Sequence, residues 1–404
     1  MLGMKVALIA PVTYSLPPKK YGGTERIVHG LAEGLTKRGH DVTLFATKDT
    51  KSSAKVVSFV DKGVVESGIK DPFGTNTWSL VHIGNAYKMS DRFDIIHDHL
   101  HEISIPTANM SRTPVLVTLH SAINETNKYL YESLDSPNYV TISHSQRRPL
   151  PTINYGGNVY NGLNMEHYPF SLKDKGYLLY VGRISREKGV HYAIEAALKL
   201  NLPLIIAAKI TQVEDDINYF NRYVKPKLSK QIRWIGEVDE EQRNELMANA
   251  LCFLHPVTWP EPFGLTLIEA MACGCPVVAF SQGSIPELIV DGKTGFVVET
   301  VSQMIASIKK IKQIDRAYCR QHALDKFNME RMITGYEKAY REVIKHQKVL
   351  KAYRKQSRKY KRSLDLADVA RRQSKRFIIS PVLYSHDVRS QLVLPKKKNF
   401  DDQD

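Results

Sequence analysis

The chain has 404 residues, 43% of them hydrophobic and 25% charged, which is a composition typical of globular proteins. One hydrophobic core rarely organises more than about 250 to 300 residues, so the length predicts two domains. No apolar run approaches the roughly 18 residues of a membrane span, so we expect a water-soluble body. Residues 1–10 are not followed by a small-residue cleavage site; they predict a buried first strand rather than a signal peptide, and a cytoplasmic protein.

The formal net charge of +15 is concentrated at the C-terminal end. Residues 345–404 contain 17 Lys or Arg and 6 Asp, a net charge of +11, which leaves +4 for the first 344 residues. We therefore assign the basicity to a tail, residues 346–404, and not to a nucleic-acid-binding body. The tail could attract lipid headgroups, RNA or only water, and residues 380–404 have little that could pack.

The four cysteines are too few and too scattered for a disulfide framework. Cys273-Gly274-Cys275 is compatible with a metal site or with small buried residues between a helix and a strand. Without a second Cys pair or a close His pair, the buried interpretation is favoured.

Short β-branched runs alternate with longer segments of helical period, which predicts parallel sheets with crossover helices. In the first half, a helix over 24–38 ends at Gly39, a residue typical of helix C-termini. The strands expected there are residues 6–10, 42–46, 95–97, 115–119 and 139–142.

After Asn161-Gly162 the strand pattern pauses, and a second series begins near residue 177. Its expected strands are residues 177–181, 204–208, 232–235, 252–255, 276–280 and 295–298, with helices over 190–199 and 240–250. An amphipathic helix over 328–349 is expected to close this domain, and 351–376 could extend it as a basic helix. The predicted units are 1–165, 176–345 and 346–404: two doubly wound α/β domains facing a central cleft, and a tail.

The segment from Glu261 to Ala279 is the most informative part of the sequence. Gly264 lets the backbone approach a ligand closely where a helix begins, and the free amides of a helix start bind anions. Glu269 lies eight positions after Glu261, about two helical turns along. The two carboxylates could therefore accept hydrogen bonds from hydroxyl groups on either side of a bound phosphate.

This segment resembles the E-x7-E region of the family 4 retaining glycosyltransferases, which have the GT-B fold of two Rossmann-like domains. The resemblance continues through residues 283–289 and 291–297 and, more weakly, from about residue 4 to 345. It implies that Glu261 contacts hydroxyls of the transferred sugar and that Glu269 accepts from the ribose of the nucleotide. It also implies that the backbone amides of Phe263, Gly264 and Leu265 line the sugar and phosphate.

A second basic loop follows the first strand of the second domain, from Val181 to Gly189. Arg183 and Lys188 can converge on one diphosphate, with Arg binding two oxygens and Lys supplying a compact charge. The loop resembles the family's G-R-x-x-x-x-K-G phosphate loop. Arg186, which that pattern does not require, is interpreted as a solvated surface charge.

In the first domain, Tyr21-Gly22-Gly23-Thr24 lies between the first strand and its helix. The dinucleotide fingerprint G-x-G-x-x-G is absent, which disfavours a dehydrogenase. The family resemblance assigns Gly22 and Gly23 to a loop that faces the donor diphosphate; a tight turn without a ligand is the alternative.

Several further cleft residues are predicted. His120 ends the strand over 115–119 and resembles the family histidine that touches the donor sugar. His97 and His99 resemble the family's D-x-x-H-x-H strand end near the acceptor, whereas a zinc site lacks a fourth ligand. Val238 follows Ile235-Gly236-Glu237, a segment similar to the one that packs on the nucleotide base, with an ordinary strand end as the alternative.

The resemblance implies a retaining glycosyltransferase that moves a sugar from a nucleotide-diphosphate sugar to a glycan, lipid or small molecule. Arg183, Lys188 and the helix-start amides would stabilise the leaving diphosphate, so no metal or other cofactor is expected. The alternatives are a sugar-nucleotide epimerase, a phosphorylase, for which a cofactor lysine or second phosphate site is not found, and a non-catalytic binding protein. The tail is expected to bring the enzyme to a membrane-borne acceptor, at the inner face of the membrane.

Overall fold

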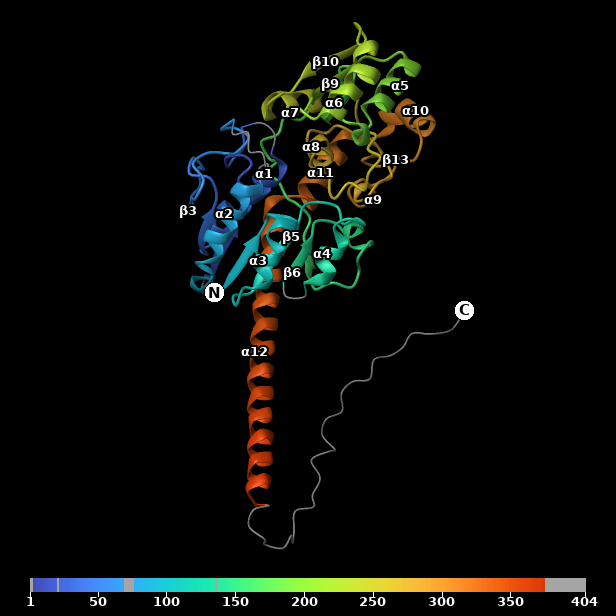
Figure 1. Ribbon diagram of the computed structural model, residues 1–404. Coiled ribbons are helices and arrows are strands. Elements are labelled where there is room, and N and C mark those ends of the chain that lie inside the picture. Colours follow the sequence, from blue (N-terminus) through green and yellow to red (C-terminus); the bar gives the residue numbers. More distant parts are fainter. Residues whose placement is uncertain (1–2, 20–21, 69–75, 135–136, 375–404) are drawn as a thin grey trace, which may run out of the picture. The chain divides into compact units, whose positions relative to one another are not determined.

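The computed structural model describes residues 3–19, 22–68, 76–134 and 137–374 (Figure 1). Tyr21 of the predicted glycine loop and residues 375–404 of the predicted tail lie outside this part of the chain. Two wholly parallel sheets are present, with strand orders β3-β2-β1-β4-β5-β6-β7 and β10-β9-β8-β11-β12-β13. The fold class predicted from the sequence, two Rossmann-like α/β domains, is confirmed.

The first sheet and its helices come from the N-terminal part of the chain. Its strands are β1 (Lys5–Ile9), β2 (Asp41–Phe45), β3 (Lys55–Val57), β4 (Ile95–Asp98), β5 (Val115–Leu119), β6 (Asn138–Thr141) and β7 (Tyr155–Asn158). Its helices are α1 (Gly23–Lys37), α2 (Asn76–Tyr87), α3 (Ile105–Asn109) and α4 (Lys128–Ser133). All five predicted strands are found, and β3 and β7 are additions at the two edges of the sheet.

The second sheet contains all six predicted strands. They are β8 (Leu178–Arg183), β9 (Leu204–Lys209), β10 (Ile232–Gly236), β11 (Cys252–His255), β12 (Val277–Phe280) and β13 (Gly295–Val298). The accompanying helices are α5 (Val190–Leu200), α6 (Glu214–Tyr219), α7 (Glu240–Asn249), α8 (Leu265–Ala272), α9 (Ile285–Leu288), α10 (Val301–Lys310) and α11 (Arg316–Lys326). The last helix of the chain is α12 (Met329–Ser374).

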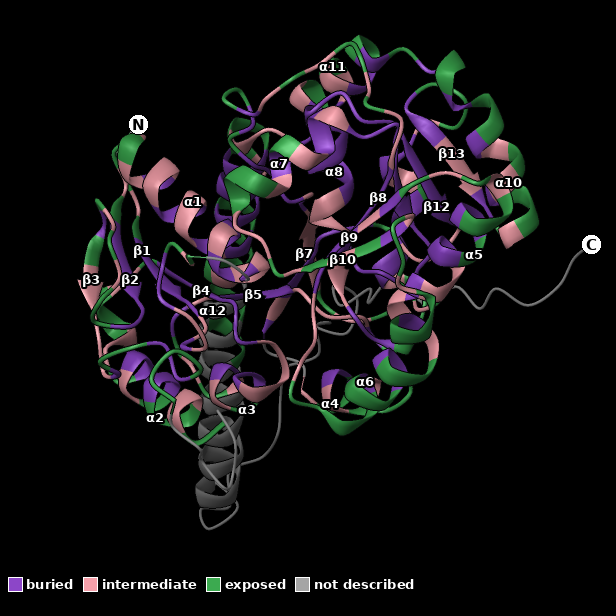
Figure 2. Cartoon of the chain, turned by 90° about the horizontal axis from the view of Figure 1, so that it is seen from above, coloured by how far each residue is buried: buried purple, intermediate pink, exposed green. Residues whose placement is uncertain are grey.

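The central strands β1, β4 and β5 bury both faces, as a parallel sheet covered by helices requires, whereas the edge strands β3 and β7 are partly exposed. In β1, Val6 and Leu8 join a core that includes the apolar face of α1, whereas Ala7 and Ile9 join a second core with α2 and α3. Figure 2 shows β1 and β2 largely as buried, β3 as partly exposed, and the outer faces of α1 and α2 as partly exposed. The period-two alternation of side chains therefore attaches helices to both faces of the sheet.

The strand order reverses direction at one place in each sheet. In the first sheet β1 lies between β2 and β4, and in the second β8 lies between β9 and β11. At such a switch point the loops after neighbouring strands diverge to opposite faces and leave a crevice at the carboxyl ends. The loops that follow β1, β4, β8 and β11 are therefore those expected to form a ligand site.

The helix predicted to close the second domain packs instead on the first, so that prediction was wrong. Glu337 of α12 forms an ion pair with Arg38 (3.1 Å) and a hydrogen bond with His40 (2.9 Å), and Tyr340 hydrogen-bonds His97 at 2.6 Å. The amphipathic helix itself is present, but its sequence pattern does not determine on which of the two sheets its apolar face packs. From Lys348 onward the chain forms a separate unit, described as the last part of α12 up to Ser374.

The entry of α12 depends on a close backbone contact at Gly162. A Cβ atom there would lie 2.3 Å from the carbonyl oxygen of Asn328 and 2.9 Å from Cβ of Met332. We expect Gly162→Ala to cost about 1 to 3 kcal/mol, because neither backbone segment can move freely. Gly84→Ala is the matched control, since its Cβ would meet nothing within 4 Å on α2.

Thermal melting of the two variants checks this prediction. Gly162→Ala should melt below the wild type, and Gly84→Ala should melt at or slightly above it, because alanine favours a helix over glycine. Equal melting temperatures for the two variants would contradict the assigned contact.

Candidate active site

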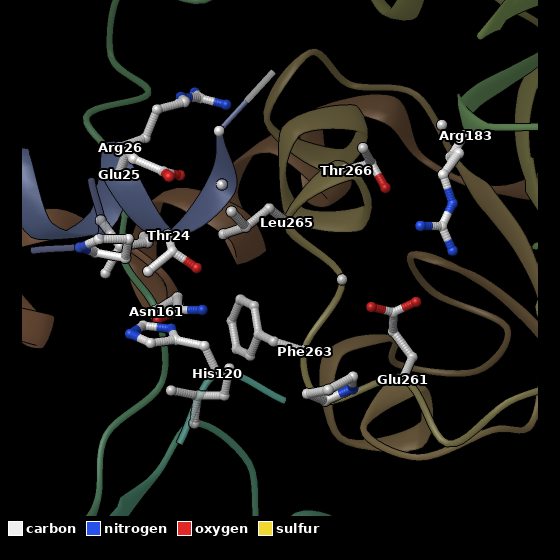
Figure 3. A pocket seen from close by; sticks show the side chains of 18 of the residues that line it. Thr24, Glu25, Arg26, His120, Asn161, Arg183, Glu261, Phe263, Leu265 and Thr266 are labelled. Carbon is white, nitrogen blue, oxygen red and sulfur yellow. The ribbon is translucent and has the colours of Figure 1, made fainter. Parts of the chain in front are cut away.

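A cavity of about 630 Å³ lies at the carboxyl ends of the two sheets, lined by the loops of both switch points (Figure 3). The predicted residues that line it are Gly22, Gly23, His120, Arg183, Lys188, Glu261, Phe263, Gly264, Leu265 and Glu269. Val238 does not line it; this side chain is half-buried against the core after β10. Ten of the predicted site residues thus converge on one cavity, and Val238, His97 and His99 do not line it.

Helix α8 begins at the cavity with Gly264 as its N-cap residue. Gly264 has φ +88°, and a Cβ there would lie 2.9 Å from a side-chain carbon of Leu267, so the conformation and the space both favour glycine. No acidic residue occupies the first turn of α8, and no side chain caps it. The first amides of the helix are therefore available to an anion.

Helix α1 provides a second helix start beside the first. Gly22 is its N-cap residue with φ +144° and no side-chain cap, and both Gly22 and Gly23 line the cavity. A Cβ on Gly23 would lie 3.2 Å from Cδ1 of Leu265, the first residue of α8. The two helix starts therefore lie in close contact and both line the same cavity.

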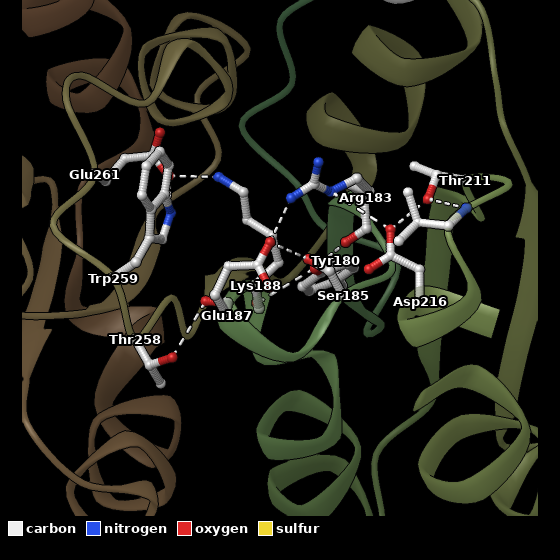
Figure 4. A network of polar contacts seen from close by, with 11 residues as sticks. Tyr180, Arg183, Ser185, Glu187, Lys188, Thr211, Asp216, Thr258, Trp259 and Glu261 are labelled. Carbon is white, nitrogen blue, oxygen red and sulfur yellow. Dashed lines mark hydrogen bonds and ion pairs between the residues drawn. The ribbon is translucent and has the colours of Figure 1, made fainter. Parts of the chain in front are cut away.

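Lys188 and Glu261 form the central ion pair of the cavity (Figure 4). Lys188 Nζ lies 2.6 Å from Glu261 Oε2, which also accepts from Trp259 Nε1 at 3.0 Å. The ammonium lies 4.7 Å from the centre of the Trp259 ring, a cation–π distance. Gly189, which follows Lys188, has φ +70°, and a Cβ there would lie 2.0 Å from the carbonyl oxygen of Pro256. The loop therefore holds the ammonium against one face of the cavity.

Arg183 ends β8 and points along the same loop (Figure 4). Its guanidinium is hydrogen-bonded to Glu187 and lies 3.9 Å from Asp216. Hydrogen bonds from Ser185 and Arg183 outweigh the effect of partial burial and lower the pKa of Glu187. Arg186 points elsewhere, onto the ring of Tyr223, and does not line the cavity.

Glu269 is almost fully buried, with 1% of its surface exposed, and is held by two arginines. Its Oε1 accepts from Arg26 Nη1 at 2.5 Å and from Arg243 Nη2 at 3.0 Å. Arg26 belongs to α1 and also binds Tyr168 and Glu240, at 2.9 Å each. Burial opposes the charged state of Arg26, but Glu269 raises its pKa above the ordinary value.

Neither arginine was predicted from the sequence. Arg26 directly follows Gly22-Gly23-Thr24-Glu25, so the predicted glycine loop indicated that this part of the chain lies near the ligand. Arg243 lies in the middle of α7, where nothing in the sequence distinguishes it from a solvated charge.

His120 forms one wall of the cavity, beside Asn161 (Figure 3). Its Nε2 lies 2.9 Å from Nδ1 of His99. Burial lowers the pKa of His120 well below the ordinary value, and the nearby His99 and His101 lower it further. The imidazole is therefore neutral at physiological pH.

His97 and His99, expected in the cleft, lie behind its wall and are fully buried. His97 is held between Tyr340 of α12 (2.6 Å) and Thr118 of β5 (2.7 Å). The D-x-x-H-x-H pattern thus marks a buried support for His120. The histidine of this segment that does line the cavity is His101, which was not predicted.

In the sequence, Asn161 marks only the boundary between the two strand series. It is 3% exposed, lines the cavity, and its Oδ1 has no hydrogen-bond partner in the described part of the chain. A buried amide oxygen without a partner is costly unless a ligand or water satisfies it. Asn161 is therefore a further candidate for contact with a ligand.

Glu25 lines the cavity in the first turn of α1 and is 5% exposed. Burial raises its pKa from 4.5 to about 7. At a pH between these two pKa values, Glu25 is protonated in more of the folded protein than of the unfolded chain. The free energy of unfolding therefore decreases as the pH rises through this range. Above about pH 7 the carboxylate is ionised in both states and this loss is complete.

We expect Glu25→Gln to remove this penalty. The variant should melt well above the wild type at pH 8, with a gain of up to about 3 kcal/mol, and close to it at pH 5. Differential scanning calorimetry at the two pH values measures the effect. The same gain at both pH values would show that packing, not ionisation, is responsible.

Cys273 and Cys275 are fully buried between α8 and β12, as the favoured interpretation expected. Within the described ranges, no group of three or more His, Cys, Asp or Glu is arranged to hold a metal ion. The helices of those ranges also include none that is long and apolar enough to span a membrane.

Two family models match most of the chain between them. Residues 167–328 match "Glycosyl transferases group 1", and residues 21–152 match "Glycosyltransferase Family 4". The first match covers the whole second sheet, the second covers β2 to β6 of the first sheet, and together they include every predicted site residue. The chain belongs to the family 4 glycosyltransferases, and the resemblance stated from the motifs is confirmed.

Curated relatives and solved structures agree with this assignment. A glycogen synthase of Mycobacterium tuberculosis is 27% identical over 341 residues, covering 71% of this chain and 81% of that protein. A phosphatidyl-myo-inositol mannosyltransferase of Propionibacterium freudenreichii is 26% identical over 319 residues, covering 71% and 80%.

Among solved structures, sucrose-phosphate synthase from Thermosynechococcus elongatus superposes with a TM-score of 0.70 at 18% identity, covering 85% of this chain and all of that one. Anabaena HepE, solved with UDP and glucose, gives a TM-score of 0.62 at 18% identity, covering 82% and 97%. At these identities the superpositions establish the fold.

Proposed function

We propose that this glycosyltransferase is a retaining enzyme that moves a sugar from a nucleotide-diphosphate sugar to a hydroxyl group of a glycan, lipid or small molecule. The observation that carries the proposal is the convergence of two uncapped helix starts, Arg183, Lys188 and two buried glutamates on one cavity. A diphosphate, a ribose and a sugar together use all of these groups. The UDP-bound structure of HepE supports a donor of this class.

In this arrangement the diphosphate lies over the start of α8, between Arg183 and Lys188. The arriving phosphate competes with Glu261 for the ammonium of Lys188, which frees the carboxylate to accept from sugar hydroxyls. At Glu269 both arginines occupy Oε1, so Oε2 is the oxygen that accepts from the ribose. Phe263 and Leu265 contribute backbone amides next to the sugar and phosphate.

The chemical step requires a breaking bond, a forming bond and one proton transfer. The bond between the anomeric carbon and the phosphate oxygen breaks, and the acceptor oxygen bonds to the same carbon from the same face. The acceptor proton passes to the departing phosphate oxygen. Arg183, Lys188 and the α8 amides stabilise the negative charge that develops on the diphosphate, so the protein itself supplies the positive charge and we propose that no metal ion is required.

His120 contributes to sugar binding as a neutral imidazole. Because burial holds its pKa well below the ordinary value, it carries no positive charge that would oppose an oxocarbenium-like transition state. Its role is to position the sugar through hydrogen bonding.

The stereochemical outcome and the metal requirement can be tested together. Purified protein is incubated with UDP-, GDP- and ADP-sugars, and proton NMR follows the configuration of the first-formed product or hydrolysis product, with and without EDTA. The proposal expects the donor's anomeric configuration in the product and an unchanged rate in EDTA. An inverted product would refute the retaining mechanism, and loss of turnover in EDTA would refute metal independence.

We further propose that the tail brings this enzyme, acting in the cytoplasm, to a membrane-borne acceptor. The support is its net charge of +11 over residues 345–404, which anionic headgroups attract by roughly 1 kcal/mol per basic residue near the surface. Cosedimentation with vesicles containing phosphatidylserine should therefore decrease strongly in a variant that ends at Val349. Equal vesicle binding by the two proteins would exclude the tail as an anchor, and retention of RNA instead of vesicles would indicate a nucleic-acid partner.

A further inference from the structure

His101 has an unusual backbone conformation at the edge of the cavity. Its φ is +56°, in the left-handed region, and the only other described residue except glycine with positive φ is Asn201. Left-handed conformations are uncommon for residues with a side chain and often accompany functional sites. The left-handed backbone of His101 therefore indicates that its side chain has a function in the cavity.

The chain around His101 is held in place by hydrogen bonds. Asp98 at the end of β4 accepts from the backbone amide of Leu100 at 2.8 Å and from the hydroxyl of Tyr87 at 2.9 Å. The hydroxyl of Ser104 donates to the carbonyl of His101 at 3.0 Å. The imidazole is thus presented from a rigid turn between β4 and α3.

One hydrogen bond determines which ring nitrogen of His101 carries the proton. The backbone N–H of His120 donates to Nδ1 of His101 at 3.1 Å, so Nδ1 must be unprotonated. Burial lowers the pKa of His101, and the nearby Glu102 offsets this only in part, so the ring is neutral at physiological pH. The single proton therefore lies on Nε2, which is a fixed hydrogen-bond donor.

In His120 the other ring nitrogen, Nε2, is the one bound to protein. Its Nε2 is engaged by Nδ1 of His99 at 2.9 Å, which leaves Nδ1 for a ligand. The rings of His101 and His120 are 5.2 Å apart between centroids and lie edge to face, and both line the cavity. The wall opposite Glu261 thus has two neutral imidazoles, each with one nitrogen bound to protein and one available.

We propose that His101 is a second sugar-binding histidine, which donates a hydrogen bond from Nε2 to a hydroxyl oxygen of the transferred sugar. The inference rests on the proposed function, because it assumes that the sugar of a nucleotide sugar occupies the cavity. It adds a contact that depends on the sugar and not on the nucleotide. Donors that lack the hydroxyl at this position should consequently be poorer substrates.

The variant His101→Asn distinguishes a direct contact between His101 and the sugar from a role of His101 in holding the backbone of His120. Asparagine tolerates the left-handed conformation, and its Oδ1, attached to Cγ as Nδ1 is, can accept from the N–H of His120. It has no atom at the position of Nε2, so only the outer donor is lost. His167→Asn is the matched control, because His167 is exposed and does not line the cavity.

Calorimetric titrations with UDP, GDP and ADP, and with the nucleotide sugar that the wild type binds most tightly, provide the test. His101→Asn should bind the bare nucleotide as the wild type does and the nucleotide sugar about 3- to 10-fold more weakly, the usual cost of one neutral hydrogen bond. His167→Asn should match the wild type with every ligand.

Three outcomes would overturn the inference. Unchanged affinity of His101→Asn for the nucleotide sugar shows that Nε2 makes no contact. An equal loss for bare nucleotide and nucleotide sugar assigns His101 a supporting role. Failure of the wild type to bind any nucleotide or nucleotide sugar overturns the proposed function itself, and this inference with it.

An independent spectroscopic measurement tests the tautomer. Nitrogen-15 NMR of histidine-labelled protein at pH 7.5, assigned by loss of one signal in His101→Asn, should show a neutral ring protonated at Nε2. A ring protonated at Nδ1, or a charged ring, would contradict the inference.

Discussion

Replacing Arg183 with alanine should lower donor turnover by about 100- to 1,000-fold, the usual effect of removing one preorganised group that stabilises transition-state charge. The expected loss is large because the guanidinium acts where charge develops on the leaving diphosphate. The loss should appear mainly in kcat, because ground-state phosphate contacts from Lys188 and the α8 amides remain. Steady-state hydrolysis of the preferred nucleotide sugar measures both constants.

Arg186→Ala is the matched control for this prediction. Arg186 lies three residues further along the same loop, has the same charge, and stacks on Tyr223 away from the cavity. Its removal should leave turnover within about twofold, since solvated surface charges contribute little. Equal losses in the two variants would mean that the general positive potential of the loop, and not the guanidinium of Arg183, supports the reaction.

Replacing Glu269 with alanine should be the most destabilising of the site substitutions, and should also weaken donor binding. Its removal leaves Arg26 and Arg243, with only 14% and 12% of their side chains exposed, without their shared carboxylate. Breaking a buried ion pair by removing one partner costs about 3 to 5 kcal/mol. The melting temperature should decrease accordingly, and nucleotide affinity should decrease because the ribose loses its acceptor.

Glu240→Ala provides the comparison, because Glu240 binds the same Arg26 but is 47% exposed. A half-exposed ion pair contributes at most about 1 kcal/mol, so this variant should melt near the wild type. The double variant Glu269→Ala/Arg26→Met should recover part of the stability, since it removes a largely buried charge that keeps only the half-exposed Glu240 as its carboxylate partner, but none of the nucleotide affinity. Recovery of affinity would show that Glu269 acts only through Arg26.

The strands that could be predicted are those with continuous apolar, β-branched sequences. The strands β1, β5 and β12 are buried along almost their whole length in covered sheets, and their composition alone indicates this. By contrast β7 contains Gly156-Gly157, and β3 has three residues at an edge. The glycines of β7 do not favour a strand, and its pairing depends on the neighbouring strand and on the close approach of α12. The three residues of β3, Lys55-Val56-Val57, are too few to show a pattern, although two of them are valines.

The site could be predicted where glycines and charges occur at fixed spacing in one loop. Gly264 and Glu269 belong to one helix start, so the sequence distance between them determines their distance in space. The pairing of Arg26 with Arg243 around Glu269 joins residues far apart in the chain, and no local pattern encodes such a contact. The same limit explains why His101 was not distinguished from its neighbours His97 and His99.

We propose above all that the cavity binds a nucleotide sugar through Arg183 and Glu269. A combined thermal-shift and hydrolysis screen against UDP-, GDP- and ADP-sugars, with Arg183→Ala and Glu269→Ala alongside, tests it most directly. We expect the sugars of one nucleotide family to stabilise the wild type and to be hydrolysed by it, and both responses to be weakened in the two variants. No response of the wild type to any donor, or responses unchanged in both variants, would contradict it.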